Sequence, residues 1–436
     1  MDMDCSVSPL DLFDGQLIQR DVTNGYYKEV QPVNSLQGGN VVEFRIPGEG
    51  KAFTDLRHSY LKMRIGVKKS NGHNLDAAVD KVSLINYIGA TLFSQIDISL
   101  NGTQISSSTN HALRSIIDVM INYGREAKEG QLQAALFYKD TAGQMDTTEI
   151  EPADAATPVN RGLQTRWELV KSNNSIELIA RIHSDIFLQP KMLVNGVEMQ
   201  LKFHKNKDSF SLISGVANAA YKIVLEDISL MLRKCVLTDT KYNQLQSISK
   251  RDIVYPITQV LTKVFTYSAG PSSLTINNAV QGKIPNRMII GLVSNAAYNG
   301  DYTKNPFNFQ HFGLRGVAVK LDGNTVNGEA IKVNFDNNRY MEGFWTLFAS
   351  TGYMFKDDGC YINRDDYKEG YTLFAYDFTP TLCDGQYVDP EKSGDLAVEL
   401  LFKAALTEAV TVCMYFEYNS MITINTARQV TAHFNI

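Results

Sequence analysis

The side chains that most often perform chemistry are widely spaced in this chain. No two of its seven histidines have the H-x-H or H-x-x-x-H spacing that directs two imidazoles to one metal ion. A catalytic metal site would need such a pair together with a carboxylate. The spacing therefore predicts no metal ligand among the histidines, which are His58, His73, His111, His183, His204, His311 and His433.

The acidic pairs Asp357-Asp358 and Asp365-Asp366 form a cluster of carboxylates that could bind calcium. They lack the regular alternating ligand spacing of a calcium loop, so we expect a solvated loop. The chain also has no G-x-S-x-G turn, no phosphate-binding glycine loop followed by Lys-Ser/Thr, and no dinucleotide fingerprint. The sequence thus predicts no catalytic, cofactor-binding or metal-binding residue, no cofactor and no enzyme.

Two further candidates have a structural explanation beside the chemical one. Tyr302 and the segment Asn305-Pro-Phe-Asn-Phe309 form an aromatic, polar loop that could bind a sugar or a neighbouring subunit, or pack under its own loop. Asn101 and Asn173 have the N-glycosylation pattern, but Asn101 is better explained by a turn. The cysteines are odd in number and lack a metal-knuckle pair, which predicts small core residues in a reducing compartment: Cys5, Cys235, Cys360, Cys383 and Cys413.

Length and charge limit the class of protein. A chain of 436 residues exceeds one ordinary hydrophobic core, so two or three domains are expected. The net charge of −5 and the lack of a long basic run argue against strong direct nucleic-acid binding. No run approaches the roughly 18 apolar residues of a membrane span, and the N-terminus shows no secretory signal.

The strongest pattern is an internal repeat. The strand-like segment 95–102 ends in Asn101-Gly102, and the segment 316–323 ends in Asp322-Gly323. Both dipeptides tolerate the positive φ angles of a tight hairpin turn. The two turns lie 323 − 102 = 221 positions apart, about half of the 436 residues. Each turn is followed by a helix-like run, at 110–124 and at 338–352.

The two helix-like runs predict similar amphipathic helices. Their apolar residues have the i, i+3, i+4, i+7 spacing of a buried stripe, and each run ends in a glycine suited to a left-handed C-cap, Gly124 or Gly352. The predicted buried stripes are Leu113, Ile116, Ile117 and Met120 in the first helix, and Met341, Phe344, Trp345 and Phe348 in the second. The repeat therefore predicts an all-β unit with one short amphipathic helix, duplicated in tandem.

Alternating strands elsewhere extend this interpretation to the whole chain. Alternation is clear at 42–46, 61–67, 176–182, 197–203 and 396–402, as in antiparallel sheets with one buried face. Two β-sandwiches are expected, and a jelly roll fits the length of each half better than an immunoglobulin-like sandwich. We divide the chain into an N-terminal arm (1–34), a first jelly roll (35–238), a linker (239–256) with a hinge at Tyr255-Pro256, and a second jelly roll (257–436).

Two segments are expected to lie outside this regular plan. Residues 1–34 have no sustained period and predict an arm that packs on its own domain or on a neighbour, with a disordered tail as the alternative. Residues 125–162 are polar and small, and predict a long exposed loop with a weakly ordered middle.

Several stretches resemble one known family. The stretches are 10–13, 24–27, 42–48, 181–189, 193–197, 207–210, 284–287, 291–293, 305–309, 366–374 and 377–380. Together they are similar to the major capsid (hexon) protein of Polinton/Maverick elements and the related adintoviruses, over most of the chain from about residue 10.

The resemblance implies a double jelly-roll capsid protein of the adenovirus and tectivirus lineage. In that lineage three copies form a pseudo-hexameric capsomer that tiles an icosahedral shell, here of a double-stranded DNA virus or a virus-like transposon. It implies a homotrimer, a penton or minor capsid protein as partner, assembly inside the host cell and location in the virion. Loops 294–312 and 353–370 are our candidates for the trimer contact. The alternative is a minor capsid, vertex or glycan-binding jelly-roll module, which the internal repeat disfavours.

Overall fold

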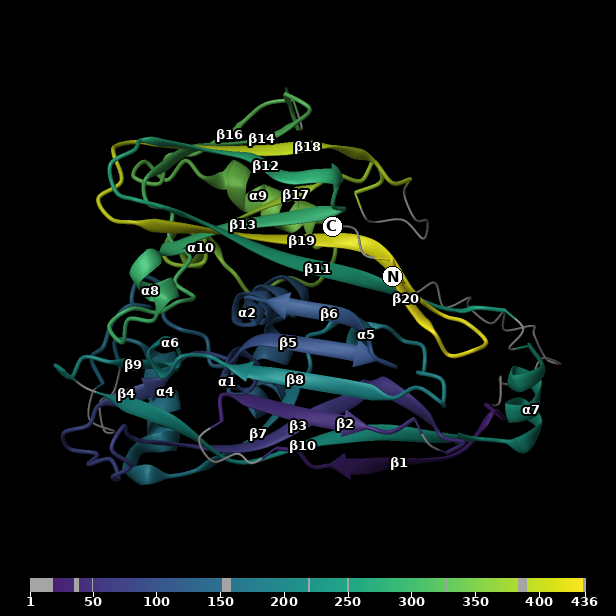
Figure 1. Cartoon of the computed structure of the whole chain (residues 1–436). Coiled ribbons are helices and arrows are strands. Elements are labelled where there is room, and N and C mark those ends of the chain that lie inside the picture. The colour runs from purple at the N-terminus through teal and green to yellow at the C-terminus, as the bar shows by residue number, and fades with distance from the viewer. Residues whose placement is uncertain are drawn as a thin grey trace, which may run out of the picture.

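Two β-sandwiches, which we call the first and second rolls, are stacked on one another (Figure 1). The computed structural model describes residues 19–34, 39–48, 50–150, 158–218, 220–248, 251–326, 328–382 and 390–433. None of the helices in these ranges is long and apolar enough to cross a bilayer. The all-β prediction is confirmed, because strands dominate both rolls.

The strands of the first roll occupy the lower half of the molecule in Figure 1. They are β1 (Val22–Val30), β2 (Val41–Ile46), β3 (Phe53–Lys69), β4 (Val82–Leu84), β5 (Phe93–Leu100), β6 (Thr103–Thr109), β7 (Ile176–Arg181), β8 (Met199–Lys205), β9 (Leu212–Ser214) and β10 (Tyr221–Leu237). Those of the second roll are β11 (Ile253–Tyr267), β12 (Ser273–Lys283), β13 (Arg287–Ser294), β14 (Leu314–Leu321), β15 (Asn324–Thr325), β16 (Ile331–Lys332), β17 (Leu373–Asp377), β18 (Ser393–Phe402), β19 (Val410–Ile424) and β20 (Val430–His433).

The helices are short and lie in the connections. In the first half they are α1 (Ile88–Thr91), α2 (His111–Asn122), α3 (Arg125–Glu129), α4 (Arg161–Val170), α5 (Asp185–Leu188), α6 (Asp208–Ser211) and the 3-10 turns η1 (Gln131–Ala135) and η2 (Lys171–Asn173). Helix α7 (Asp239–Ile248) joins the rolls, and α8 (Asn295–Asn299), α9 (Met341–Ser350) and α10 (Arg364–Lys368) belong to the second.

The two rolls have the same strand connectivity. The sheets of the first roll have the orders β1-β10-β3-β7 and β2-β8-β5-β6, and those of the second β11-β19-β13-β17 and β12-β18-β14-β15. Numbered in chain order within each roll without β4, β9, β16 and β20, both rolls read 1-8-3-6 and 2-7-4-5. We call the sheet with the order 1-8-3-6 the outer sheet of its roll; it is β1-β10-β3-β7 in the first roll and β11-β19-β13-β17 in the second. This order is that of an eight-stranded jelly roll.

The predicted repeat marks equivalent positions in the two rolls. The Asn101-Gly102 turn joins the fourth and fifth strands of the first roll, and Asp322-Gly323 does the same in the second. All four turn residues have positive φ angles, from 46° to 83°. Helices α2 and α9 both lie between the fifth and sixth strands. The hairpin and helix predictions are therefore confirmed.

The predicted buried face is right for α2. For α9 it is right for Phe344 and Phe348, which are partly buried and pack on the core, and wrong for Met341 and Trp345. Leu113, Ile116, Ile117 and Met120 are all buried. In α9 the buried residues are Gly343, Leu347 and Ser350, whereas Met341 and Trp345 are 37% and 48% exposed. Apolar residues lie on both sides of α9, so spacing alone could not identify the inner face. Gly352 has the expected left-handed φ of 77°, but Gly124 has a φ of −76°.

Three expectations about irregular segments need correction. Part of the predicted arm packs on its own domain, as one alternative expected, but it does so as a regular strand, β1, which pairs with β10 at the edge of a sheet; residues 1–18 lie outside the described residues. The predicted hinge Tyr255-Pro256 lies inside β11, where Tyr255 is buried. The predicted exposed loop forms α3 and η1 and buries Leu132 and Phe137, because its few apolar residues pack on the core; residues 151–157 lie outside the described part.

Replacing Ile117 by alanine tests the importance of α2 for the core. Ile117 is fully buried, so Ile117→Ala should lower the free energy of unfolding by about 2–5 kcal/mol. The measurement is urea unfolding followed by tryptophan fluorescence and circular dichroism. Val79, which is 62% exposed, is the control, and Val79→Ala should leave the midpoint nearly unchanged. Equal effects of the two substitutions would contradict the assigned burial.

Candidate functional site: the contact between the rolls

Three of the histidines predicted to be no metal ligands, His58, His204 and His311, each contact a structural partner. Among the described residues no group of three or more His, Cys, Asp or Glu side chains could hold a metal ion. His58 contacts Asp55 at 2.7 Å, and His204 contacts Asp97 at 3.0 Å, both near the surface. His311 instead stacks on the ring of Phe335, with centroids 4.1 Å apart.

The acidic cluster divides into exposed and buried members. Asp357, Asp358 and Asp365 are exposed, as expected for a solvated loop. Asp366 is not: it forms a capping box with Asn363 at the start of α10 and an ion pair of 2.5 Å with Lys139 of the first roll. The prediction of a solvated loop is therefore wrong for Asp366, because this carboxylate caps a helix and contacts the other roll.

The aromatic loop packs on the first roll of the same chain. Asn305, Phe307 and Phe309 are buried. The Asn305 side chain donates to Asp140 Oδ2 at 3.2 Å, and its backbone N–H donates to Asp146 Oδ1 at 2.8 Å. Of the alternatives left open by the sequence, packing describes the loop, although its partner is the other roll. The described cysteines, Cys235, Cys360 and Cys413, are buried and free, while Cys5 and Cys383 lie outside the described residues.

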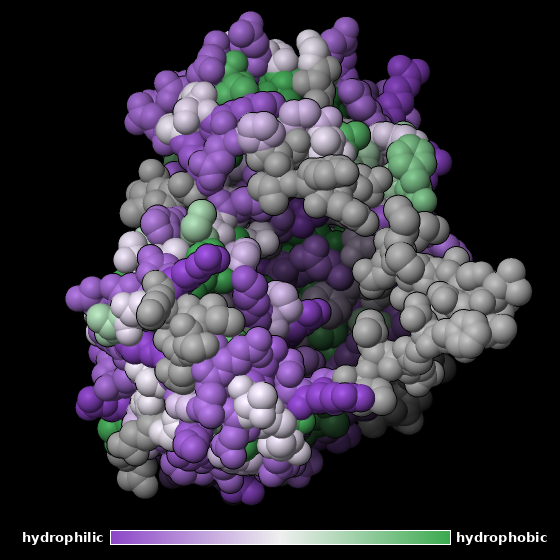
Figure 2. Space-filling model, turned by 90° about the vertical axis from the view of Figure 1, so that its right-hand side faces the viewer, coloured by the Kyte–Doolittle hydropathy of each residue, from purple (hydrophilic) through white to green (hydrophobic). Residues whose placement is uncertain are grey.

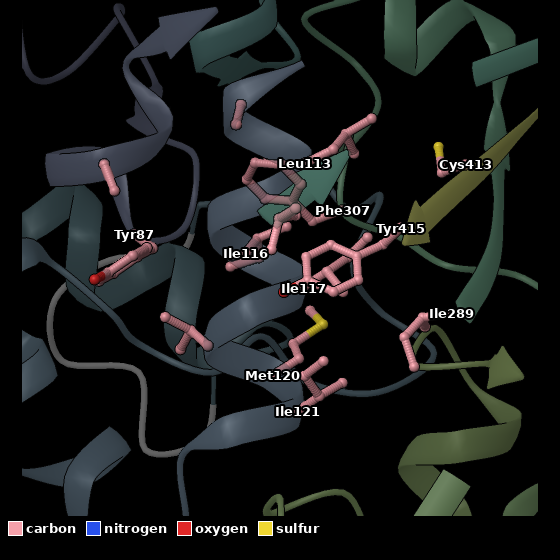
Figure 3. Packing of buried hydrophobic residues seen from close by; sticks show 14 of the residues in the cluster. Tyr87, Leu113, Ile116, Ile117, Met120, Ile121, Ile289, Phe307, Cys413 and Tyr415 are labelled. Atoms are coloured by element: carbon pink, nitrogen blue, oxygen red, sulfur yellow. The ribbon is translucent and has the colours of Figure 1, made fainter. Parts of the chain in front are cut away.

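The contact between the rolls is centred on α2. Figure 3 shows Ile117, Met120 and Ile121 of this helix beside Tyr415 and Ile289, which come from β19 and β13 of the second roll. All five side chains are buried. Helix α2 therefore contributes to the core of its own roll and to the contact with the other roll, and one connected apolar cluster extends through both.

A buried ion pair lies at one side of this contact. Arg114 of α2 binds Asp185 of α5, and their side chains are only 2% and 5% exposed. Asp185 also accepts a hydrogen bond of 3.3 Å from the backbone N–H of Val260 in β11. Burial raises the pKa of Asp185, although the nearby charge of Arg114 opposes this rise. The carboxylate thus joins α2 and α5 of the first roll to a strand of the second.

A second buried group resembles a catalytic relay in its residue types. His183 contacts Asp118 at 2.6 Å and the Tyr87 hydroxyl at 2.9 Å. Burial opposes ionisation of Asp118, but the hydrogen bond and charge of His183 outweigh it and lower the pKa of this carboxyl. Tyr87 and His183 are each 1% exposed, so a substrate has no access to either. The group therefore orients α2 within the first roll.

The two groups explain the sequence spacing of their members. Arg114 and Asp118 are one helical turn apart, which is about 6 Å along α2. His183 and Asp185 are two residues apart near the start of α5, which is roughly 6.6 Å in extended chain. The four side chains therefore pair off in one alignment of the two segments. The sequence signal for this site is the presence of Arg114 and Asp118 among the apolar residues of the helix.

The segment after α2 bridges the rolls. Lys128 of α3 donates to the Cys360 carbonyl at 2.6 Å and to the Met120 carbonyl at 3.0 Å. The Tyr371 hydroxyl of the second roll donates to the Asp140 carbonyl at 2.8 Å. The loops 294–312 and 353–370, which were our candidates for a trimer contact, supply many of these partners. Much of their surface is thus used within one chain.

The second point of contact surrounds Tyr255. Its hydroxyl donates to the Met192 carbonyl at 3.2 Å and accepts from the Val194 N–H at 3.0 Å. Beside it, an open cavity of about 610 Å³ separates the rolls next to α7, and Figure 2 shows this side of the molecule hollowed between them. Its lining is largely apolar, with Phe53, Met192 and Leu237 among the contributors. No catalytic arrangement of side chains accompanies these lining residues.

Removing Asp185 should weaken the contact strongly. Asp185→Ala leaves Arg114 buried without its partner and the Val260 N–H without its acceptor, so we expect a loss of about 3–5 kcal/mol in the free energy of unfolding. Chemical unfolding monitored by circular dichroism measures it. The matched control is Glu198→Ala, which removes the exposed Arg45–Glu198 pair and should cost less than about 1 kcal/mol. A cost for Asp185→Ala as small as that of the control would contradict this assignment.

Lys128 should make stability depend on pH. Burial lowers its pKa to about 7 in the folded protein from an ordinary 10.5. Above pH 7 the unfolded chain still binds this proton and the folded chain does not, so the free energy of unfolding rises with pH. The contribution is at most about 1.4 kcal/mol per pH unit. Lys128→Met should lack this rise between about pH 7 and 9, when its unfolding curves are compared with those of the wild type. Parallel pH profiles would refute the shifted pKa.

Known proteins are similar to this chain over both of its rolls. No protein-family model matches the chain. A curated relative, "Uncharacterized protein F54H12.2" of Caenorhabditis elegans, is 25% identical over 427 residues, which cover 94% of this chain and 97% of the relative.

Three solved structures share the architecture at low sequence identity. The Sputnik virophage structure is 12% identical with a TM-score of 0.60, covering 98% of this chain and 92% of that one. The PBCV-1 virus capsid is 12% identical with a TM-score of 0.57 (97% and 100%), and the mavirus major capsid protein is 13% identical with a TM-score of 0.55 (97% and 93%). The chain therefore has the double jelly-roll fold found in these viral capsid structures.

Proposed function

We propose that this chain is a major capsid protein. The observation that carries the proposal is the repeated strand order 1-8-3-6 and 2-7-4-5 within one chain, matched along nearly its whole length by viral capsid structures. The buried polar groups described above, Arg114–Asp185 and Asp118–His183–Tyr87, hold the helices and strands at the contact between the rolls. A substrate has no access to the buried side chains of these groups. The function is then one of shape and of contact between copies.

The stacking of the rolls supports assembly into trimers. Both rolls have the same fold and follow one another head to tail, so three chains supply six similar units around one axis. Such a ring has a nearly hexagonal outline and can tile an icosahedral shell. We therefore propose a homotrimeric, pseudo-hexameric capsomer that contacts further capsomers and a penton or minor capsid protein in the virion, after assembly inside the host cell.

The lineage is the finer part of the proposal. The sequence stretches at 181–189, 305–309 and 366–374 resemble hexon proteins of Polinton/Maverick elements and adintoviruses. A relative from a nematode is consistent with a gene carried by a virus-like element in an animal genome. We propose that the shell encloses double-stranded DNA of such an element or of a related virus.

Light scattering and electron microscopy test the proposal on the full chain. The purified protein should have a mass of about 146 kDa, three times the 48.7 kDa of one chain, and micrographs should show hexagonal capsomers or closed shells. A protein that stays monomeric at high concentration in every salt and pH condition would contradict the capsid function. Binding of that monomer to a glycan array would favour a glycan-binding module instead.

A further inference from the structure

Helix α9 presents apolar side chains to solvent on the side opposite its buried face. Gly343 and Leu347 face the core, while Trp345 and Met341 are 48% and 37% exposed. Phe355, which is 88% exposed, contacts the Trp345 ring edge to face with centroids 6.2 Å apart. Large apolar side chains that gather at the surface in this way commonly mark a contact with another molecule, although the exposed Glu342 lies beside them. None of the described residues therefore covers the outer side of α9.

The equivalent helix of the first roll shows what covers such a face. The outer sheet of the second roll packs on α2 (Figure 3). Thr262, Tyr415, Ile289 and Ala375 form one cross-strand row of that sheet, and exposure of these residues is between 0% and 9%. This contact joins unlike surfaces, namely the helix side of one roll and the outer sheet of the next.

The matching surface on the first roll is not covered by any part of the chain that the structure describes. On its outer sheet, Tyr27 and Ile179 are 45% and 42% exposed. Met231 and Tyr60, which are partly exposed, are register partners on the two strands between those of Tyr27 and Ile179, and their own partners on the flanking strands are Glu29 and Arg181. The centroid of the Tyr27 ring lies 5.5 Å from that of Tyr60, and the Arg233 guanidinium lies over the Tyr27 ring, 5.1 Å from its centroid. Exposed ion pairs, Lys62–Glu177 among them, border these apolar side chains.

One chain thus has a second, unused pair of the two surfaces that form its internal contact, namely α9 of the second roll and the outer sheet of the first roll. In Figure 1 the outer sheet of the first roll lies at the bottom of the stack, and the second roll, which carries α9, lies at the top. We propose that the outer sheet of the first roll of a second copy covers α9, with Trp345 and Phe355 against the region of Tyr27, Tyr60 and Ile179. This inference rests on the proposed self-assembly and names the surfaces that perform it.

Self-assembly follows from a contact between two unlike surfaces. When the first roll of a chain uses its helix surface and the second roll uses its sheet surface, the chain still has one unused surface of each kind, one on each roll. Such contacts either close into a ring or continue as a filament. Burial of a tryptophan at the centre of a protein contact commonly dominates the binding energy. An apolar centre with a border of charged pairs is the usual composition of such a contact.

Two single substitutions should each disable one end of the chain. Trp345→Glu places a charge at the α9 end, and Ile179→Glu places one at the sheet end, opposite Lys62 in register. Each variant should dissociate at a concentration at least about tenfold higher than the wild-type trimer does, as measured by analytical ultracentrifugation. Phe355→Ser, at a residue that is 88% exposed, is a second α9 variant with little risk to folding.

Mixing the two variants is the sharper experiment. Each mixed pair retains one intact contact and two disabled ends, so the mixture should form a 1:1 dimer and stop there. Leu401→Glu is the matched control, because Leu401 is 53% exposed on the other sheet of the second roll, and it should remain trimeric. Circular dichroism melting checks that every variant is folded.

The outcomes separate this inference from the proposed function. Trimers of both Trp345→Glu and Ile179→Glu with wild-type affinity would overturn the assigned contact and leave the capsid function standing. A mixture of the two variants that stays monomeric would also overturn the assigned contact. A monomeric wild-type protein would overturn both proposals. Dimers in the mixture and monomers of each variant alone would support the contact.

Discussion

Burial of α2 from both sides is the constraint on which the rest of the structure depends. A jelly roll whose fifth and sixth strands are joined by an apolar helix has a face that water would otherwise cover. In the first roll, the outer sheet of the second roll covers it, so that Ile117, Met120 and Tyr415 share one apolar cluster. The two rolls are therefore held together by the same effect that folds each of them.

Polar groups determine how the rolls meet on this apolar contact. Apolar packing is non-directional, whereas Arg114 and Asp118 can satisfy Asp185 and His183 in only one alignment of α2 with the segment before and within α5. The hydrogen bond from Val260 to Asp185 then fixes β11 against the same point. The polar groups that look most like catalytic machinery in this chain thus serve orientation, which suits a protein whose function depends on a fixed shape.

The duplicated plan also has a consequence at the ends of the stack. The contact between the rolls covers α2 of the first roll and the outer sheet of the second roll. The equivalent surfaces, which are α9 of the second roll and the outer sheet of the first roll, are not covered by the described residues. Trp345 and Phe355 on one end and Tyr27 and Ile179 on the other are large apolar side chains in solvent. Large exposed apolar groups of this kind mark surfaces that meet other molecules.

The sequence by itself determined the all-β class, the two Asn-Gly and Asp-Gly hairpins, the two helices and their equivalence, because alternation, turn chemistry and helical spacing are local properties. The burial of Leu113, Ile116, Ile117 and Met120 was also predictable, since they have the spacing of one helical stripe, but the burial of the other sides of α2 was not. Tertiary structure alone decided which side of α9 faces inward, that residues 125–150 bridge the rolls, and that Asp366 caps α10 beside Lys139. The bridge and the Lys139–Asp366 pair depend on partners more than 200 positions away in the sequence, and the inward side of α9 depends on how this helix packs on β17 of its own roll. A local pattern carries no information about either.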